Sequence, residues 1–100
     1  MYNHIPVKVA DIKQQFGTDE VNQVKSMQLF IVKGRYSNKY LLISYRTLIG
    51  VLDESTDCWM ITNTYYSRTT SRQIGRFKKD NHHRIVLPNI IDEMLGGTCL

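Results

Sequence analysis

The chain has 100 residues, of which 42% are hydrophobic and 22% charged, and its formal net charge is +4. This length and balance favour a single soluble globular domain over residues 1–100, and the apolar runs fall short of the roughly 20 residues that span a bilayer. Because the N-terminus lacks a basic-then-apolar signal pattern, we expect a cytoplasmic protein.

The first quarter of the chain, residues 1–25, is expected to be helical. Val9, Ile12 and Phe16 have the spacing of one face of a short helix, and Gly17 follows as a C-terminal cap. The polar residues after it are interpreted as a loop or one more helical turn.

Residues 27–66 are expected to form strands, because they are apolar and rich in β-branched and aromatic side chains. Residues 39–53 are interpreted either as two strands or as one long strand with a kink. Gly50 lies inside the apolar pattern and predicts a bulge or a close approach of the backbone.

The last of these strands alternates in polarity, which indicates one buried and one open face. Trp59, Ile61 and Tyr65 would share the core face. The acidic and hydroxyl-rich residues 53–57 predict the turn of a hairpin before this strand.

Residues 68–80 are expected to form the main helix. Thr70 and Gln73 match the spacing of a capping box, whereas Ser67 is a competing N-cap. The apolar stripe that would pack this helix on the sheet has two members: Ile74 and Phe77.

Residues 84–95 complete the pattern with a short strand, stopped by Pro88, and a short helix. Consecutive strands joined by short turns favour the α+β class. We therefore expect a small antiparallel sheet of three to four strands with one main helix packed on it and short terminal helices.

Positive charge is concentrated in residues 65–84, which contain six basic residues and only one acidic residue, Asp80. An ordinary solvated helix face is one interpretation, and a surface that binds a partner or phosphate is the other. In the second interpretation an aligned basic row and the two tyrosines before it supply the contacts. These candidate residues are Arg68, Arg72, Arg76, Lys79, Tyr65 and Tyr66.

Catalytic motifs are missing from the sequence, which has no nucleophile elbow, phosphate loop or dinucleotide fingerprint. Asp80, His82 and His83 could supply metal ligands, but adjacent histidines on a strand point in opposite directions. We therefore expect no enzyme, no metal and no cofactor, and keep a chelator-sensitive activity of this cluster as a weaker hypothesis.

One motif over residues 40–80 combines a strand, an acidic turn and a hydroxyl-rich helix start. Its positions are Ser44, Tyr45, Thr47, Asp53, Tyr66, Ser67, Thr69, Thr70, Ile74 and Phe77. This motif resembles that of a family of short, uncharacterised proteins encoded by bacteriophages and related mobile elements. That family often has histidine where this chain has Gln73.

The resemblance implies a small protein that acts by binding. Its first expected function is to bind and inhibit a host or defence protein, including a nucleoprotein complex, as an anti-CRISPR does. The alternative is a nucleic-acid-binding accessory protein that uses the basic helix 68–79. Either would act in the cytoplasm of the host bacterium, without a membrane partner. Neither function predicts an oligomeric state.

Overall fold

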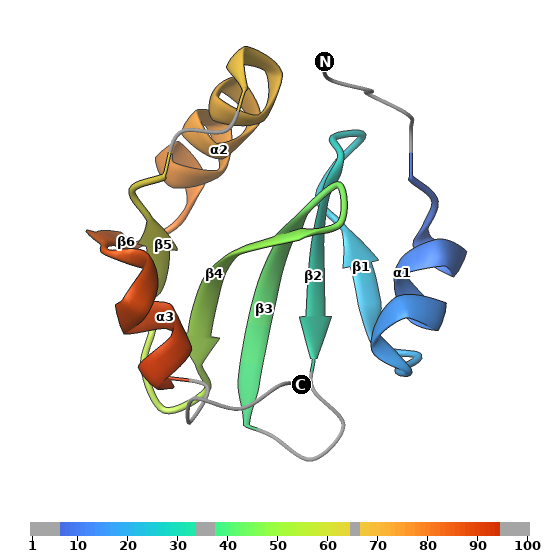
Figure 1. Cartoon of the computed structure of the whole chain (residues 1–100), viewed down its shortest axis with the longest axis horizontal. Coiled ribbons are helices and arrows are strands. Elements are labelled where there is room, and N and C mark those ends of the chain that lie inside the picture. Colours follow the sequence, from blue (N-terminus) through green and yellow to red (C-terminus); the bar gives the residue numbers. More distant parts are fainter. Residues whose placement is uncertain (1–6, 34–37, 65–66, 95–100) are drawn as a thin grey trace.

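A computed structural model describes residues 7–33, 38–64 and 67–94 of the chain, which form three helices and one six-stranded sheet (Figure 1). The helices are α1 (Val9–Phe16), α2 (Arg68–Asp80) and α3 (Pro88–Met94). The strands are β1 (Val21–Gln23), β2 (Leu29–Lys33), β3 (Lys39–Ser44), β4 (Thr47–Asp53), β5 (Trp59–Thr62) and β6 (His83–Val86).

The strands follow one another across the sheet in chain order, and each neighbouring pair is antiparallel except the last. β5 and β6 are parallel because α2 connects them as a crossover. The predicted α+β class is confirmed, whereas three to four strands was too few. β1 lies in the segment interpreted as a loop or helical turn, and its three residues are too short to show strand alternation.

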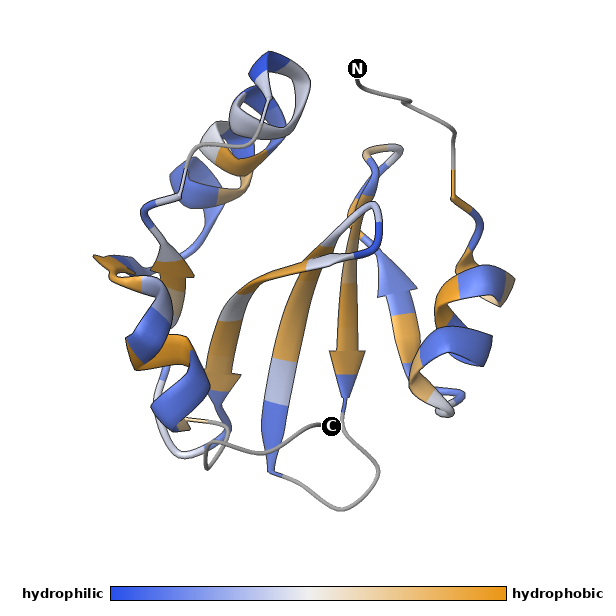
Figure 2. Cartoon of the chain, viewed as in Figure 1, coloured by the Kyte–Doolittle hydropathy of each residue, from blue (hydrophilic) through white to orange (hydrophobic). Residues whose placement is uncertain are grey.

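Helices cover both faces of the sheet. Along β2, Leu29 and Phe30 point to opposite sides, and each belongs to a different apolar cluster. One cluster includes Ile12 of α1 and Ile91 of α3, and the other includes residues of α2. Figure 2 shows the apolar residues concentrated along the central strands and the polar ones on the outer sides of the helices. The sheet is therefore the middle of three layers.

β3 and β4 are two strands rather than one kinked strand. They pair from Lys39↔Asp53 to Ser44↔Thr47, and Tyr45 in the tight turn between them has a positive φ of 56°. The turn brings Ser44 to the end of the sheet near which α2 starts, where its hydroxyl contacts that helix. No helix in the described ranges is both long and apolar enough to cross a membrane.

Gly50 shows both features expected of it. The register of β3 against β4 shifts by one residue beside it, and a Cβ at this position would lie only 3.1 Å from the backbone oxygen of Met60 in β5. The bulge and the missing side chain together let three strands approach closely at the centre of the sheet.

Alanine at position 50 is expected to destabilise the fold by about 1–3 kcal/mol, because backbone atoms of β5 must move to admit the methyl group. Urea unfolding followed by Trp59 fluorescence measures this. Gly75→Ala is the matched control, because its Cβ would meet nothing within 4 Å. Equal stability of the two variants would contradict the close contact at Gly50.

Candidate functional site

Helix α2 begins where a side chain satisfies its free backbone donors. The Ser67 hydroxyl accepts a hydrogen bond of 3.1 Å from the Thr70 backbone N–H, so Ser67 is the N-cap. The predicted capping box of Thr70 and Gln73 is wrong, because Thr70 lies buried in the first helical turn. Its hydroxyl instead accepts a 3.4 Å hydrogen bond from Ser44 and ties α2 to the sheet.

Ser67→Ala is expected to cost about 1 kcal/mol of stability, since the cap would be lost at a buried helix end. Chemical unfolding of Ser67→Ala beside Ser71→Ala measures the loss. Ser71 lies one turn further into the helix, where alanine is the better helix former, so this control should be neutral or slightly stabilising. A Ser67→Ala variant as stable as the control would rule out the capping role.

Two apolar side chains fix how α2 rotates about its axis. Ile74 and Phe77 are buried against the sheet, and the Phe77 ring meets Trp59 edge to face with 5.4 Å between centroids. Thr70 is buried on the same side. This packing agrees with the predicted stripe and determines which side of α2 faces solvent.

The solvent side of α2 is a row of cations. At about 100° per residue, the four basic candidates lie within one quadrant opposite the buried stripe, and all four are exposed. They extend about 16 Å along the helix axis. Within residues 7–33, 38–64 and 67–94 none of them has an ion-pair partner. This basic row consists of Arg68, Arg72, Arg76 and Lys79.

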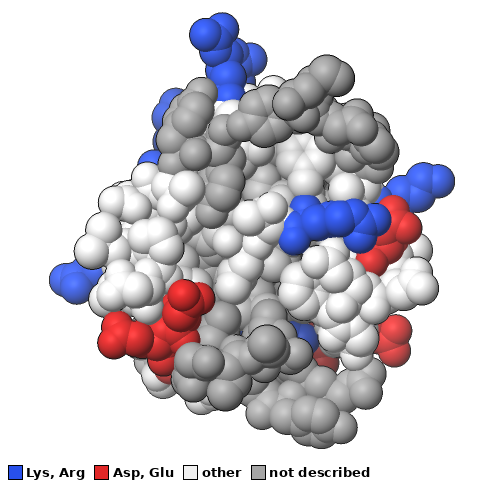
Figure 3. Space-filling view, viewed as in Figure 1, with Lys and Arg blue, Asp and Glu red and all other residues white. Residues whose placement is uncertain are grey.

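The one acid of α2 does not neutralise the basic row. Asp80 is at the end of the helix, and its carboxylate pairs at 3.1 Å with Lys25 in the turn between β1 and β2. Figure 3 shows lysine and arginine side chains projecting at the upper left, on the side of α2, while the acids lie elsewhere on this face. The helix therefore presents uncompensated positive charge to solvent.

The two tyrosines of the candidate set, Tyr65 and Tyr66, lie outside the described residues. The metal-ligand candidates Asp80, His82 and His83 line a shallow surface depression with Lys79 and Asn81. No group of three metal-ligating side chains gathers anywhere in the part of the chain that the structure describes.

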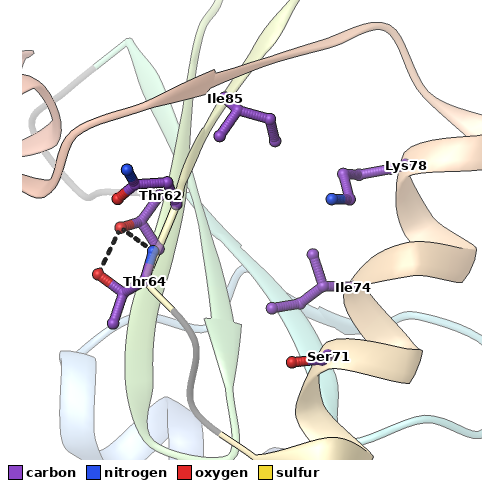
Figure 4. A pocket seen from close by; sticks show the side chains of 7 residues that line it. Thr62, Thr64, Ser71, Ile74, Lys78 and Ile85 are labelled. Atoms are coloured by element: carbon purple, nitrogen blue, oxygen red, sulfur yellow. Dashed lines mark hydrogen bonds between the residues drawn. The ribbon is translucent and has the colours of Figure 1, made fainter.

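A hollow of about 220 Å³ lies beside the basic row, between α2 and the edge of the sheet formed by β5 and β6 (Figure 4). Sequence reasoning missed it, because its walls come from three separate elements. No local signal marks it, since Ile85 is exposed like most of β6. The lining residues are Thr62, Asn63, Thr64, Ser71, Ile74, Lys78 and Ile85.

The fold and this surface define a small α+β protein with one strongly basic helix on a mixed sheet. The chain belongs to a family of unknown function, DUF8033, whose profile matches residues 11–93. The match runs from α1 to α3 and includes the whole basic helix. No curated protein and no solved structure matches the chain. An uncharacterised family was expected, whereas its phage origin stays a prediction.

Proposed function

We propose that this protein is a non-enzymatic nucleic-acid-binding protein whose basic row contacts the phosphate backbone. The observation that carries the proposal is the row itself: four exposed cations in one line, without an acid among them. Nucleic acids present regularly spaced phosphates, and neutralising them with Lys and Arg releases bound counterions.

The basic row is not explained by the stability of the helix. Arg68, Arg72 and Arg76 follow one another at intervals of four residues, and each such like-charge pair costs a helix about 0.2–0.5 kcal/mol. Arg68 also lies in the first turn, where the helix dipole disfavours a cation. Only Lys78 and Lys79, in the last turn, suit the dipole. A ligand with negative charge accounts for the remaining cations.

Equilibrium binding of labelled single strands and duplexes tests this proposal. We expect a Kd of about 10⁻⁶–10⁻⁴ M. If all four cations contact a single strand, affinity should fall about 50-fold between about 50 and 200 mM salt. An affinity that does not depend on salt, or no binding at low salt, would overturn the proposal.

A second candidate function is the one implied by the resemblance: a phage or mobile-element protein that binds and inhibits a host or defence factor, as an anti-CRISPR does. Two exposed apolar side chains near the β6 edge favour it. Ile85 is 48% exposed and Leu87 57% exposed, and apolar anchors are typical of protein interfaces. It ranks second because the outward face of α2 carries no apolar side chain.

Affinity capture from untreated bacterial lysate, followed by nuclease treatment of the captured material, separates the two candidates. An inhibitor should retain one protein that is lost with Leu87→Asp and kept with Arg72→Ala. A nucleic-acid-binding protein should release its captured material on nuclease treatment.

A further inference from the structure

The hollow and the basic row lie on neighbouring sides of the same helix. Residues four apart form ridges along α2, and three ridges follow one another around it. Ile74 and Lys78 form the ridge that walls the hollow, and the ridge of the three arginines forms most of the basic row. The ridge between them begins with Ser71 and Gly75, two of the smallest side chains available.

Gly75 has no visible role in packing. A Cβ there would meet nothing within 4 Å, yet glycine in the middle of a helix is less stable than alanine. The fold would therefore tolerate a larger side chain at this position. Because Gly75 has no side chain, the helix surface between the basic row and the hollow is low at this point, and a ligand can approach the backbone closely.

The walls of the hollow suit a flat ring with polar edges. Ile74 from α2 and Ile85 from β6 project into it from opposite sides, as Figure 4 shows. The half-buried Lys78 ammonium and the Ser71 hydroxyl also point inward. On the strand side, the Thr62 and Thr64 hydroxyls hydrogen-bond to each other at 3.0 Å and point away from α2 in Figure 4, so Ser71 and Lys78 are the polar groups that face the hollow there.

The hollow has the size of one small ring. A cavity of about 150 Å³ admits benzene, so about 220 Å³ admits a six-membered base with room for water. A two-ring purine is larger and would fit into the hollow less easily. The charge of Lys78 suits the phosphate or carbonyl oxygens that accompany such a base, and Lys78 has no ion-pair partner among the described residues.

We infer that the protein binds single-stranded nucleic acid, with phosphates on the basic row and one pyrimidine base inserted over Gly75 into the hollow between Ile74 and Ile85. This inference rests on the proposed function and deepens it. A duplex keeps its bases stacked and would have to expel one at a cost. A single strand offers unstacked bases, and apolar or aromatic contacts with them add to the phosphate attraction.

Three DNA ligands of equal length and charge density per strand test the inference on the wild type: oligo(dT), a strand of abasic sites, and oligo(dA). We expect oligo(dT) to bind about tenfold more tightly than the abasic strand, and more tightly than oligo(dA). Equal binding of oligo(dT) and the abasic strand would overturn the base pocket. No binding of any strand would instead overturn the proposed function, so the two failures are distinguishable.

Three variants locate the base. In Gly75→Gln the added side chain should block the path from the basic row to the hollow. The affinity of this variant for oligo(dT) should fall to its affinity for the abasic strand, while its thermal unfolding midpoint stays equal or rises. Ile85→Ala should lose most of the preference for oligo(dT), whereas Leu87, which is also exposed but lies outside the lining, should tolerate alanine unchanged. A wild-type preference for oligo(dT) in Gly75→Gln or Ile85→Ala would contradict insertion at this place.

Discussion

Arg72→Ala/Arg76→Ala is expected to weaken binding of a single strand about 60-fold at about 50 mM salt and about tenfold at 200 mM. The reason is that each phosphate contact contributes a fixed increment of about 0.7 to the slope of log affinity against log salt. Removing two of four contacts should therefore halve this slope, from about −2.8 to −1.4. Fluorescence anisotropy over a salt series measures affinity and slope together.

The matched control for this variant removes two cations elsewhere. Lys13 lies on α1 and Arg46 in the turn after β3, where it contacts Gln15. Lys13→Ala/Arg46→Ala has the same net charge as the α2 variant, and we expect its affinity to stay within about twofold of the wild type. If the two double variants lost affinity equally, overall charge rather than the basic row would be responsible.

Phe77→Ala is expected to destabilise the protein by about 3–5 kcal/mol, the largest stability effect we predict. Phe77 is only 2% exposed, and its ring packs edge to face on Trp59. With Ile74 it supplies the apolar anchors of α2 on the sheet. A domain of this size is stable by about 5–15 kcal/mol, so this substitution removes a large share.

Urea unfolding of Phe77→Ala and Leu87→Ala measures this difference. Leu87 is 57% exposed and should tolerate alanine within about 0.5 kcal/mol. Loss of less than about 1 kcal/mol at Phe77 would mean that the contact with Trp59 does not hold α2 in place.

Local patterns predicted the parts of the structure that depend on local chemistry. The sequence indicated α2 with the bounds that the structure has, because a capping hydroxyl precedes it and Ile74 and Phe77 repeat with helical spacing. The same periodicity placed the four cations on one side. The structural role of Gly50 was predictable, because glycine weakens a strand and therefore indicates a bulge or a close backbone contact where it interrupts an apolar one.

Features that depend on distant residues were not predictable. β1 is a strand only because β2 pairs with it, as in Val21↔Val32, and its three residues carry no periodicity of their own. The parallel pairing of β6 follows from where α2 returns the chain. The hollow needs Thr62, Ser71 and Ile85 to meet from three elements, and nothing in their local sequence indicates that.

Titration of the wild type with oligo(dT), followed by ¹H–¹⁵N NMR, maps directly which surface of the protein contacts the strand. If the basic row and the hollow bind the strand, the largest amide shifts should fall on α2, residues 68–79, and on the hollow's lining at Thr62–Thr64 and Ile85. Shifts confined to α1 and β1, on the other side of the molecule, would show that a strand binds without the basic row and would contradict the proposed binding surface.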